Sequence, residues 1–447
     1  MPQLSLHWLG PLAMVGSVVT SWFAFSGTAG LDTGSTFSMW VGAVSILLMA
    51  WSFVLALRVR LFERFWGGLD SMYRGHRWAG ALAIPTMFLH TQIEPETDGA
   101  AVIPGASNSV AEAAEGLAET GELMLYALLG VSLLRLIPYR WWRWTHKLFG
   151  LPFAFASWHF FTADKPYANG SAWGWFFGTA MVAGVAAYIW RILVRDTVAR
   201  GADYTVVDVE HFESTTRIEL APKRKPLGHN AGQFAFVRLR AKGMAEPHPF
   251  TVASGPSREN LEFYIRHLGD WSDRLPDADL LGVDARVEGP YGQFEPISSH
   301  HERAVWIAGG VGITPFLAAL DETLPSGQLP PVVLYACKST EGDPLVDLLR
   351  DAHTDGRIEL HLFASGGRRL TADVLDELFP DTLTAHHVAL CGPSGLVTDM
   401  AKAASARGCT SIETEDFDIR QGFGPDRSRE IDRATRPQIN ELVTRTS

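Results

Sequence analysis

HRWAGALAIPTMFLH, residues 76–90, and HKLFGLPFAFASWH, residues 146–159, are two apolar stretches that begin and end with histidine. The histidines are fourteen positions apart in the first stretch and thirteen apart in the second. At a rise of about 1.5 Å per residue, a helix would separate the two histidines of each stretch by roughly 20 Å. Each stretch therefore predicts a helix of nearly membrane-crossing length with an imidazole towards each end.

These stretches lie among six apolar segments in the first 200 residues. The segments run over 9–26, 37–57, 76–93, 121–137, 146–162 and 173–194. Most approach the ~20 residues that cross a hydrocarbon core of ~30 Å. The alternative is a set of buried helices in a large soluble protein, but six such segments with charged residues between them disfavour it. We expect a six-helix transmembrane bundle over residues 1–200.

Basic residues between the segments indicate the orientation of this bundle. One set of loops carries twelve of them: Arg58, Arg60, Arg64, Arg74, Arg77, Arg135, Arg140, Arg143, Lys147, Arg191, Arg195 and Arg200. The opposite set, near 27–36, 94–120 and 163–172, carries only Lys165. Because cytoplasmic loops are rich in Lys and Arg, we expect a multi-pass cell-membrane protein with both termini in the cytoplasm. We read no signal peptide at the N-terminus.

The four histidines are candidate ligands of haem iron. Histidine inside a bilayer is costly and needs a partner, and a neutral imidazole binds iron axially. The third and fifth segments both run outward, so His76 pairs with His146, and His90 with His159. This pairing predicts one bis-histidine b-type haem near each membrane face. The alternative for each histidine alone is a structural hydrogen bond, which is how we interpret His7.

One feature of the fifth segment conflicts with a straight helix. Thirteen residues leave two side chains ~140° apart around a helix, so both histidines cannot share one face. The helix is therefore kinked near Gly150 and Pro152, or it presents its histidines from different flanks.

From about residue 201 the sequence changes to that of a soluble protein. Alternating apolar residues predict strands at 204–209, 216–220 and 234–239. The motif HPFT, residues 248–251, offers an imidazole, an aromatic ring and a hydroxyl, as a flavin requires. The alternative is a proline-interrupted edge strand. The stretch YIRHLGDWS, residues 264–272, then leads from a strand into a predicted helix start that could bind a phosphate.

A second soluble module begins with an apolar strand at 304–308. The turn GGVGITP, residues 309–315, follows and leads into a predicted helix to about 324. A glycine-rich turn between strand and helix lets the backbone approach a pyrophosphate. Segments at 332–337, 345–352, 358–363, 371–378 and 388–390 then alternate as in a doubly wound parallel sheet. The motif CGP, residues 391–393, ends the last strand, where such sheets bind ligands.

Taken together, these motifs resemble a known superfamily. The histidine spacing in a six-helix unit resembles the ferric reductases and NADPH oxidases, and HPFT, GDWS, GGVGITP and CGP resemble the ferredoxin–NADP reductase-like dehydrogenase module. The resemblance covers residues from about 10 to 420. It implies a transmembrane domain at 1–200, an antiparallel β-barrel FAD domain at 201–298, an α/β Rossmann-like NAD(P) domain at 302–420, and a polar tail at 421–447.

The resemblance also implies roles for individual residues. FAD would be bound by His248, Pro249, Phe250, Thr251, Arg266, Gly269 and Ser272. The nicotinamide dinucleotide would be bound by Gly309, Gly310, Gly312, Thr314, Cys391 and Gly392. Thr251 would face the flavin N5, Cys391 would flank the nicotinamide, and Phe417 of the Glu415-Asp416-Phe417 segment would cover the flavin. The haem ligands would be His76, His90, His146 and His159.

The expected function is electron transfer from cytoplasmic NAD(P)H through FAD and two haems to an acceptor outside. Ferric iron or another metal is the favoured acceptor, because residues 94–120 are acidic and contain no Lys or Arg. The alternative is that the positive-inside bias alone removes basic residues from outer loops. Two alternatives are oxygen reduction to superoxide and a haem subunit serving a partner protein. Lys338 and Ser339 follow the strand that ends at Cys337, where a 2′-phosphate could bind, and favour NADPH over NADH. The alternative is that they form a solvated loop. We expect no obligatory protein partner.

Composition excludes other classes. A net charge of -11 without a basic stripe disfavours nucleic-acid binding. The three cysteines, Cys337, Cys391 and Cys409, contain no CxxC pair, so neither a disulfide framework nor a four-cysteine iron–sulfur cluster is expected.

Overall fold

The computed structural model of the chain describes residues 6–133, 139–194, 201–269, 271–322 and 324–415. The chain divides into two compact units at about residue 200, a helical unit and an α/β-containing unit of residues 200–418. The tail at 421–447 and Phe417 lie outside the described residues.

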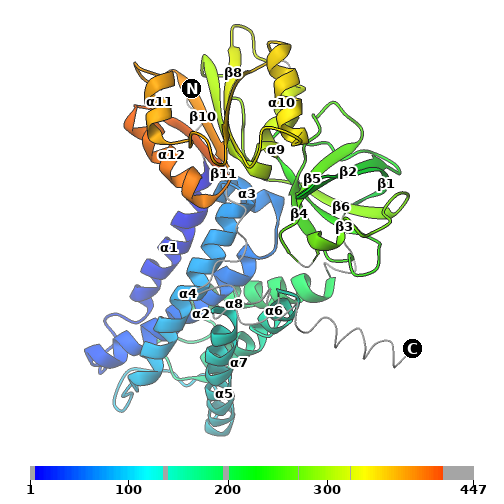
Figure 1. Cartoon of the computed structure of the whole chain (residues 1–447). Helices are drawn as coiled ribbons and strands as arrows, with labels where there is room; N and C mark the ends of the chain where they lie inside the picture. Colours follow the sequence, from blue (N-terminus) through cyan, green and yellow to red (C-terminus); the bar gives the residue numbers. More distant parts are fainter. Residues whose placement is uncertain (1–5, 134–138, 195–200, 270, 323, 416–447) are drawn as a thin grey trace. The chain divides into compact units, whose positions relative to one another are not determined.

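The helical unit contains eight α-helices within the described residues (Figure 1). They are α1 (Leu9–Ser21), α2 (Thr33–Leu55), α3 (Arg60–Trp66), α4 (Leu69–Gln92), α5 (Asn108–Leu133), α6 (Tyr139–Lys147), α7 (Gly150–Thr162) and α8 (Ala172–Ile189). Short 3₁₀ turns at Leu6–Trp8 and Trp22–Ala24 flank α1, and a π turn, Trp190–Val194, extends α8. Asp32 caps α2 by accepting a hydrogen bond from Ser35 N at 2.9 Å.

All six predicted apolar segments coincide at least in part with helices, but the number of membrane spans is not confirmed. Two helices, Thr33–Leu55 and Ala172–Leu193, are long and apolar enough to cross a membrane, with mean hydropathies of 1.9 and 1.5. Helices α1 and α7 have 13 residues each, about 20 Å of helix, which alone is shorter than a hydrocarbon core. The six-span count and the cytoplasmic orientation therefore stay predictions.

The structure decides between the two alternatives for the fifth segment and corrects the predicted loop at 94–120. The predicted fifth helix is interrupted: α6 ends at Lys147 and α7 begins at Gly150. If Gly150 carried a side chain, its Cβ atom would lie 2.1 Å from the Tyr188 ring of α8. The glycine therefore allows α8 to pack closely against the chain at the break between α6 and α7. The predicted loop at 94–120 was wrong in its second half, because α5 begins at Asn108. Residues 111–119 are rich in alanine and glutamate, which favour helix over loop.

The second unit begins with a six-stranded antiparallel sheet that curls into a barrel. Its strands are β1 (Ala202–His211), β2 (Thr215–Pro222), β3 (Phe234–Leu239), β4 (His248–Thr251), β5 (Leu261–Arg266) and β6 (Asp284–Tyr291), in the order β4-β3-β6-β1-β2-β5. Beyond β4, Ala253 N donates to Glu262 O of β5 at 2.8 Å, which draws the two edge strands together. The three strands expected at 204–209, 216–220 and 234–239 are confirmed. The helix start expected at Ser272 is only a three-residue 3₁₀ turn.

A five-stranded parallel sheet follows, in the order β11-β10-β7-β8-β9. Its strands are β7 (Arg303–Gly309), β8 (Leu329–Cys337), β9 (Glu359–Ala364), β10 (His386–Cys391) and β11 (Ser411–Glu415). Its helices are α9 (Thr314–Leu320), α10 (Pro344–Thr354), α11 (Ala372–Leu378) and α12 (Ser394–Ala406). The predicted helix after the glycine-rich turn ends at Leu320, four residues before the expected limit of about 324.

Both faces of this sheet are covered, as the doubly wound pattern predicts. Side chains of α9 and α10 pack with one set of strand residues, including Trp306 and Tyr335. Side chains of α11 and α12 pack with the alternate set, including Val305 and Leu390. The two helix pairs lie on opposite sides of the sheet in Figure 1. The strand order reverses between β7 and β10, which is where such sheets bind ligands beyond the carboxyl ends of the strands.

Candidate functional site

Two of the four histidines, His76 and His146, lie together in the helical unit. His76 is on α4 and His146 is on α6, and their ring centroids are 6.0 Å apart. Metal–nitrogen bonds of about 2 Å on both sides of one iron would place two ring centroids roughly 6 Å apart. The observed spacing therefore fits axial ligation of a single iron by these two imidazoles.

The second pair, His90 and His159, comes from α4 and α7. His90 lies in the last turn of α4, and His159 lies near the end of α7. These two imidazoles are close enough to interact electrostatically. The break between α6 and α7 lies between His146 and His159, which removes the difficulty that a straight thirteen-residue spacing presents.

Hydrogen bonds on α4 identify the ring nitrogen that is available for a metal. The Nδ1 atom of His76 lies 2.8 Å from Ser52 O, and Nδ1 of His90 lies 3.0 Å from Ser38 O. A main-chain oxygen can only accept, so each Nδ1 carries the proton and each Nε2 keeps its lone pair. Protein ligands of metals commonly have this arrangement. The residues present thus fit a haem at each pair.

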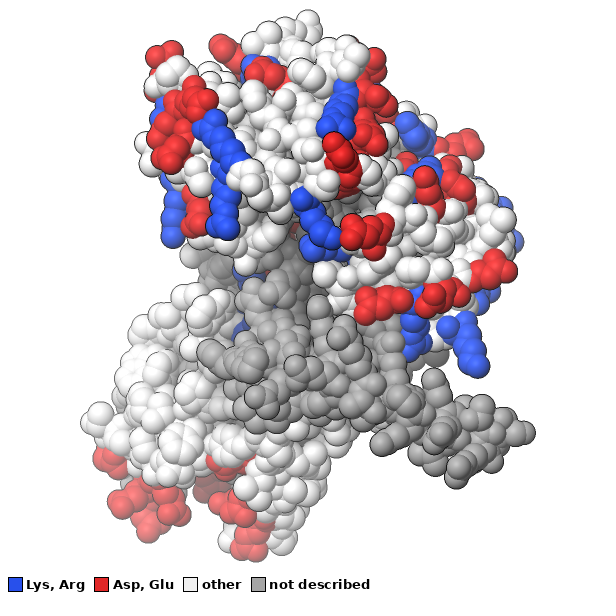
Figure 2. Space-filling model, in the orientation of Figure 1, with Lys and Arg blue, Asp and Glu red and all other residues white. Residues whose placement is uncertain are grey.

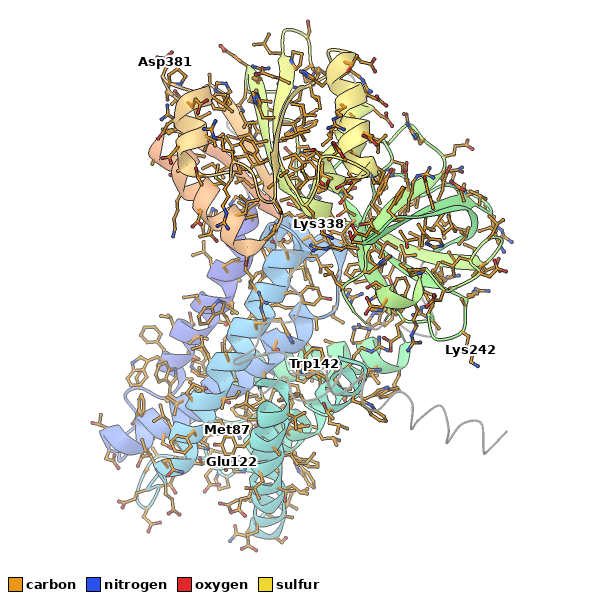
Figure 3. The ribbon with its side chains drawn as sticks, viewed as in Figure 1. Met87, Glu122, Trp142, Lys242, Lys338 and Asp381 are labelled. Carbon is orange, nitrogen blue, oxygen red and sulfur yellow. The ribbon has the colours of Figure 1, made fainter. Side chains whose placement is uncertain are left out.

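The other histidine of each pair is held differently. Nδ1 of His146 and Nδ1 of His159 are buried and have no hydrogen-bond partner within the described part of the chain. His146 instead stacks on Trp142, one turn earlier on α6, with centroids 4.8 Å apart. Figure 3 labels Trp142 among the side chains of this helix. Among the described residues, no cluster of three or more His, Cys, Asp or Glu could hold a separate metal ion.

In the second unit, the structure brings the two glycine-containing turns into contact. A Cβ on Gly312 would lie 2.5 Å from Cys391 O, and one on Gly309 would lie 2.7 Å from Pro393 Cδ. Gly392, at φ +155°, lies against the backbone of Gly309. The turns that follow β7 and β10 therefore form one continuous backbone surface at the point where the strand order reverses.

The barrel contributes residues beside this surface. Arg266 is exposed at the end of β5. Its Nη1 atom lies close to Gly310, 3.8 Å from the position that a Cβ atom would take on this glycine. Gly310 itself has φ +56°, a conformation that favours glycine. Arg266 thus places a guanidinium next to the glycine-rich turn, where a phosphate group would be bound.

The HPFT motif forms β4, and its side chains divide between the two faces of the strand. The rings of His248 and Phe250 both pack against Trp271, at 4.7 and 5.5 Å between centroids. Thr251 is buried. Pro249 pairs with Phe236 of β3. The roles of the four HPFT residues in flavin binding stay predictions.

Other predicted residues have local partners. The Ser272 oxygen accepts hydrogen bonds from Leu268 N at 2.9 Å and Gly269 N at 3.1 Å, so it closes its own turn. Thr314 Oγ1 donates to Val311 O at 2.9 Å within the glycine-rich turn. Cys337, Cys391 and Cys409 are buried. Burial raises the pKa of Cys337 and of Cys409.

Lys338, which the sequence associates with a 2′-phosphate, has an acidic neighbour. Its Nζ lies 3.1 Å from Glu213 Oε1 of the barrel, and both side chains are well exposed. Figure 3 shows Lys338 directed towards the barrel.

Sequence reasoning missed three features of these sites. It did not identify Ser38 and Ser52 as partners of His90 and His76, although both serines are fourteen residues apart on α2, like the histidines on α4. It did not predict the stacking of Trp142 on His146. Glu415 was predicted only as part of the flavin-covering segment, but its Oε1 lies 3.8 Å from a Cβ on Gly292 of the barrel.

Two family profiles match separate parts of the chain. The family described as "Ferric reductase like transmembrane component" matches residues 41–157, which include His76, His90 and His146 but end two residues before His159. The family described as "FAD-binding domain" matches residues 203–295, which form the barrel.

Curated relatives agree with these profiles. NADPH oxidase 1 of Mus musculus is 27% identical over 155 residues, which cover 33% of this chain and 25% of the relative. Ferric reduction oxidase 7, chloroplastic, of Arabidopsis thaliana is 32% identical over 127 residues, which cover 24% of this chain and 17% of the relative. The chain thus matches a quarter or less of the length of these two proteins.

Solved structures show only a weaker likeness. Phthalate dioxygenase reductase has a TM-score of 0.43 at 17% identity, and it covers 48% of this chain and 68% of its own. Likeness at this level adds nothing to the assignment.

The two profile matches cover residues 41–157 and 203–295, so in these segments the chain is similar to ferric reductase-like transmembrane proteins and to FAD-binding domains. The curated relatives named above, an NADPH oxidase and a ferric reduction oxidase, are similar to it over 155 and 127 residues.

Proposed function

We propose that the chain transfers electrons from NADPH, or NADH, through FAD and two b-type haems to an acceptor on the far side of the cell membrane. The observation that carries this proposal is the pairing of His76 with His146 at 6.0 Å, in a segment that matches a ferric reductase-like transmembrane family. When bound, FAD accepts a hydride and passes on single electrons, and haem carries single electrons. The remaining roles belong to the residues of the chain.

In the second unit, the glycines after β7 and the CGP turn after β10 hold the nicotinamide dinucleotide. Gly309, Gly310 and Gly312 allow a pyrophosphate to approach the backbone. Arg266, which lies beside Gly310, would bind a phosphate of FAD. Cys391 and Gly392 would lie beside the nicotinamide. In the barrel, Thr251, Phe250 and His248 of β4 would contact the flavin and its phosphates, and Phe417 would cover the flavin ring.

In the helical unit, His76 and His146 would bind one haem iron, and His90 and His159 would bind the other. Because two imidazoles of the chain would hold each iron, an acceptor would not need to bind the metal.

We favour ferric iron or another metal as this acceptor, with oxygen as the alternative. Residues 94–122 carry seven carboxylates, those of Glu94, Glu96, Asp98, Glu112, Glu115, Glu119 and Glu122. The one basic residue predicted on this side, Lys165, is buried, and its Nζ donates to Phe160 O at 2.8 Å and Ala163 O at 3.0 Å. Figure 2 shows acidic side chains gathered at one end of the helical unit. A cation would be attracted there.

Steady-state turnover of the purified protein in detergent tests the proposal. NADPH or NADH is supplied with a ferric chelate or with oxygen as acceptor. We expect reduction of haem by NADPH with no added protein, and faster turnover with ferric chelate than with oxygen. Superoxide formation as the main product would favour the alternative acceptor. Haem that stays oxidised under NADPH and NADH would contradict the proposal and favour a subunit that serves a partner.

A further inference from the structure

Helix α2 presents a serine to each of the two α4 histidines. Ser38, Ser45 and Ser52 recur every seven residues, about 10 Å or two helical turns apart. On α4, His76, Ala83 and His90 recur at the same interval. The contacts run antiparallel: Ser52 with His76, Ser45 with Ala83, and Ser38 with His90.

The end contacts involve both the hydroxyl and the main-chain oxygen of the serine. Nδ1 of His76 lies 2.8 Å from Ser52 Oγ and 2.8 Å from Ser52 O. Nδ1 of His90 lies 3.2 Å from Ser38 Oγ and 3.0 Å from Ser38 O. Each Nδ1–H thus has two oxygens within reach.

The serine hydroxyl hydrogens have acceptors of their own. Ser38 Oγ donates to Ile93 O at 2.5 Å, and Ser52 Oγ lies 3.5 Å from His76 O. Because Ser38 Oγ donates its hydrogen to Ile93 O, a lone pair of this Oγ faces the imidazole of His90. The Ser52 Oγ lies near Nδ1 of His76 in the same way. Gly42 keeps α2 close enough for the outer contact, because a Cβ there would lie 2.8 Å from Nδ1 of His90.

The two sides of each pair therefore differ. His76 and His90 each donate to a serine, whereas Nδ1 of His146 and of His159 has no partner among the described residues. A hydrogen-bond acceptor on Nδ1–H makes an imidazole a stronger electron donor through Nε2, which stabilises the oxidised metal. Only one ligand of each iron would be affected in this way.

We propose that Ser52 and Ser38 are positioning residues that orient His76 and His90 and separately lower the reduction potentials of the two haems. The inference rests on the proposed haem ligation. It predicts that each serine acts on one haem only, because the two contacts lie fourteen residues apart on α2.

Redox titration of the haem absorbance in the full-length protein tests this. Alanine keeps the main-chain oxygen that each Nδ1 reaches and removes only the hydroxyl contact. Through the loss of that hydroxyl, Ser52→Ala should raise the potential of one haem, and Ser38→Ala that of the other. We expect at least a threefold change in the one-electron equilibrium constant, about 28 mV. The double variant should shift both, and Ser52→Thr, which keeps the hydroxyl, should restore the wild-type value.

Ser45→Ala is the matched control. Ser45 lies on the same face of α2 and donates to Ala83 O at 2.8 Å, so its loss removes a comparable hydrogen bond without a histidine contact. It should leave both potentials and the haem content unchanged. Loss of one haem in Ser52→Ala but not in Ser45→Ala would also support the inference.

Three outcomes would overturn it. Wild-type potentials in Ser52→Ala and Ser38→Ala, with two haems bound, would show that the serines have no such role. An equal shift in Ser45→Ala would show a general packing effect. A wild-type protein that binds no haem would overturn the proposed function as well, which distinguishes the two failures.

Discussion

The imidazole rings of His76 and His146 lie 6.0 Å apart, centroid to centroid, although 69 residues separate them and they belong to different helices, α4 and α6. A spacing this close brings together two groups that are costly to bury in a bilayer without a partner. The shared partner we infer is one iron.

Replacement of His90 should separate the reduction of FAD and the first haem from the delivery of electrons to the acceptor. In His90→Leu we expect one haem to remain, NADPH to reduce FAD and that haem, and delivery to a membrane-impermeant acceptor to fall at least tenfold. The reason is the position of His90 at the end of α4 opposite to His76. Stopped-flow absorbance and acceptor reduction in vesicles measure the two steps.

The reciprocal variant is the control. In His76→Leu the remaining haem should stay oxidised under NADPH but be reduced by dithionite. Reduction of the impermeant acceptor by His90→Leu at the wild-type rate would refute the assignment of the outer pair.

The contact between the two nucleotide-site turns should be sensitive to a single methyl group. Gly312→Ala places a Cβ 2.5 Å from Cys391 O, so the backbone must move. We expect a loss of about 1–3 kcal/mol in stability and a raised KM for NADPH. Thermal unfolding and steady-state kinetics measure the two effects.

Gly395→Ala is the matched control, since a Cβ there meets nothing within 4 Å. Its KM should equal that of the wild type, and its stability should be equal or higher by up to about 1 kcal/mol, because Gly395 lies in α12 and alanine favours a helix over glycine. A Gly312→Ala protein with wild-type kinetics would remove this turn from the nucleotide site.

Cofactor preference should depend on Lys338. If the 2′-phosphate binds there, Lys338→Ala should lower kcat/KM for NADPH about tenfold, as expected for a lost charged hydrogen bond of about 1.4 kcal/mol. The value for NADH should stay unchanged. Glu213→Gln should raise kcat/KM for NADPH, because Glu213 competes with the 2′-phosphate for the Lys338 ammonium group.

The control is Lys242→Ala, on an exposed loop of the barrel that Figure 3 shows well away from Lys338. It should change neither value. An equal loss for NADPH and NADH in Lys338→Ala would place the 2′-phosphate elsewhere.

Stability should depend on pH through Lys165. Burial lowers the pKa of this lysine from 10.5 to about 8. Between these values the unfolded chain binds more protons than the folded one, so stability rises with pH over this window. The gain has an upper bound of about 3 kcal/mol.

Lys165→Met removes the titrating group. The difference in Tm between the wild type and this variant should therefore increase, in favour of the wild type, from pH 8 to pH 10. Lys242→Met should show no such trend. A difference that is constant with pH would mean that Lys165 is more solvated than its three carbonyl neighbours suggest.

Local patterns predicted much of this fold, and long-range pairing explains what they missed. Alternation and glycine position predicted β1, β2, β3 and the strand–turn–helix at 304–315, because these features depend on neighbouring residues. The contact of Gly312 with Cys391 needs β10 beside β7, a pairing across about 80 residues.

The errors have similar causes. Residues 108–120 were predicted as loop because their charge was weighed above the helix propensity of alanine and glutamate. The serines of α2 were overlooked because a serine in an apolar segment has no local signature, and only its partner on α4 reveals a role. The interruption before α7 was one of two open alternatives, and the packing of Tyr188 against Gly150 accounts for it.

Pigment analysis with a low-temperature spectrum of the purified full-length protein tests the central claim most directly. Four imidazoles in two pairs predict two haems per chain, both b-type and low-spin in the resting state. One haem per chain, or a high-spin resting spectrum, would contradict the pairing of His76 with His146 and of His90 with His159.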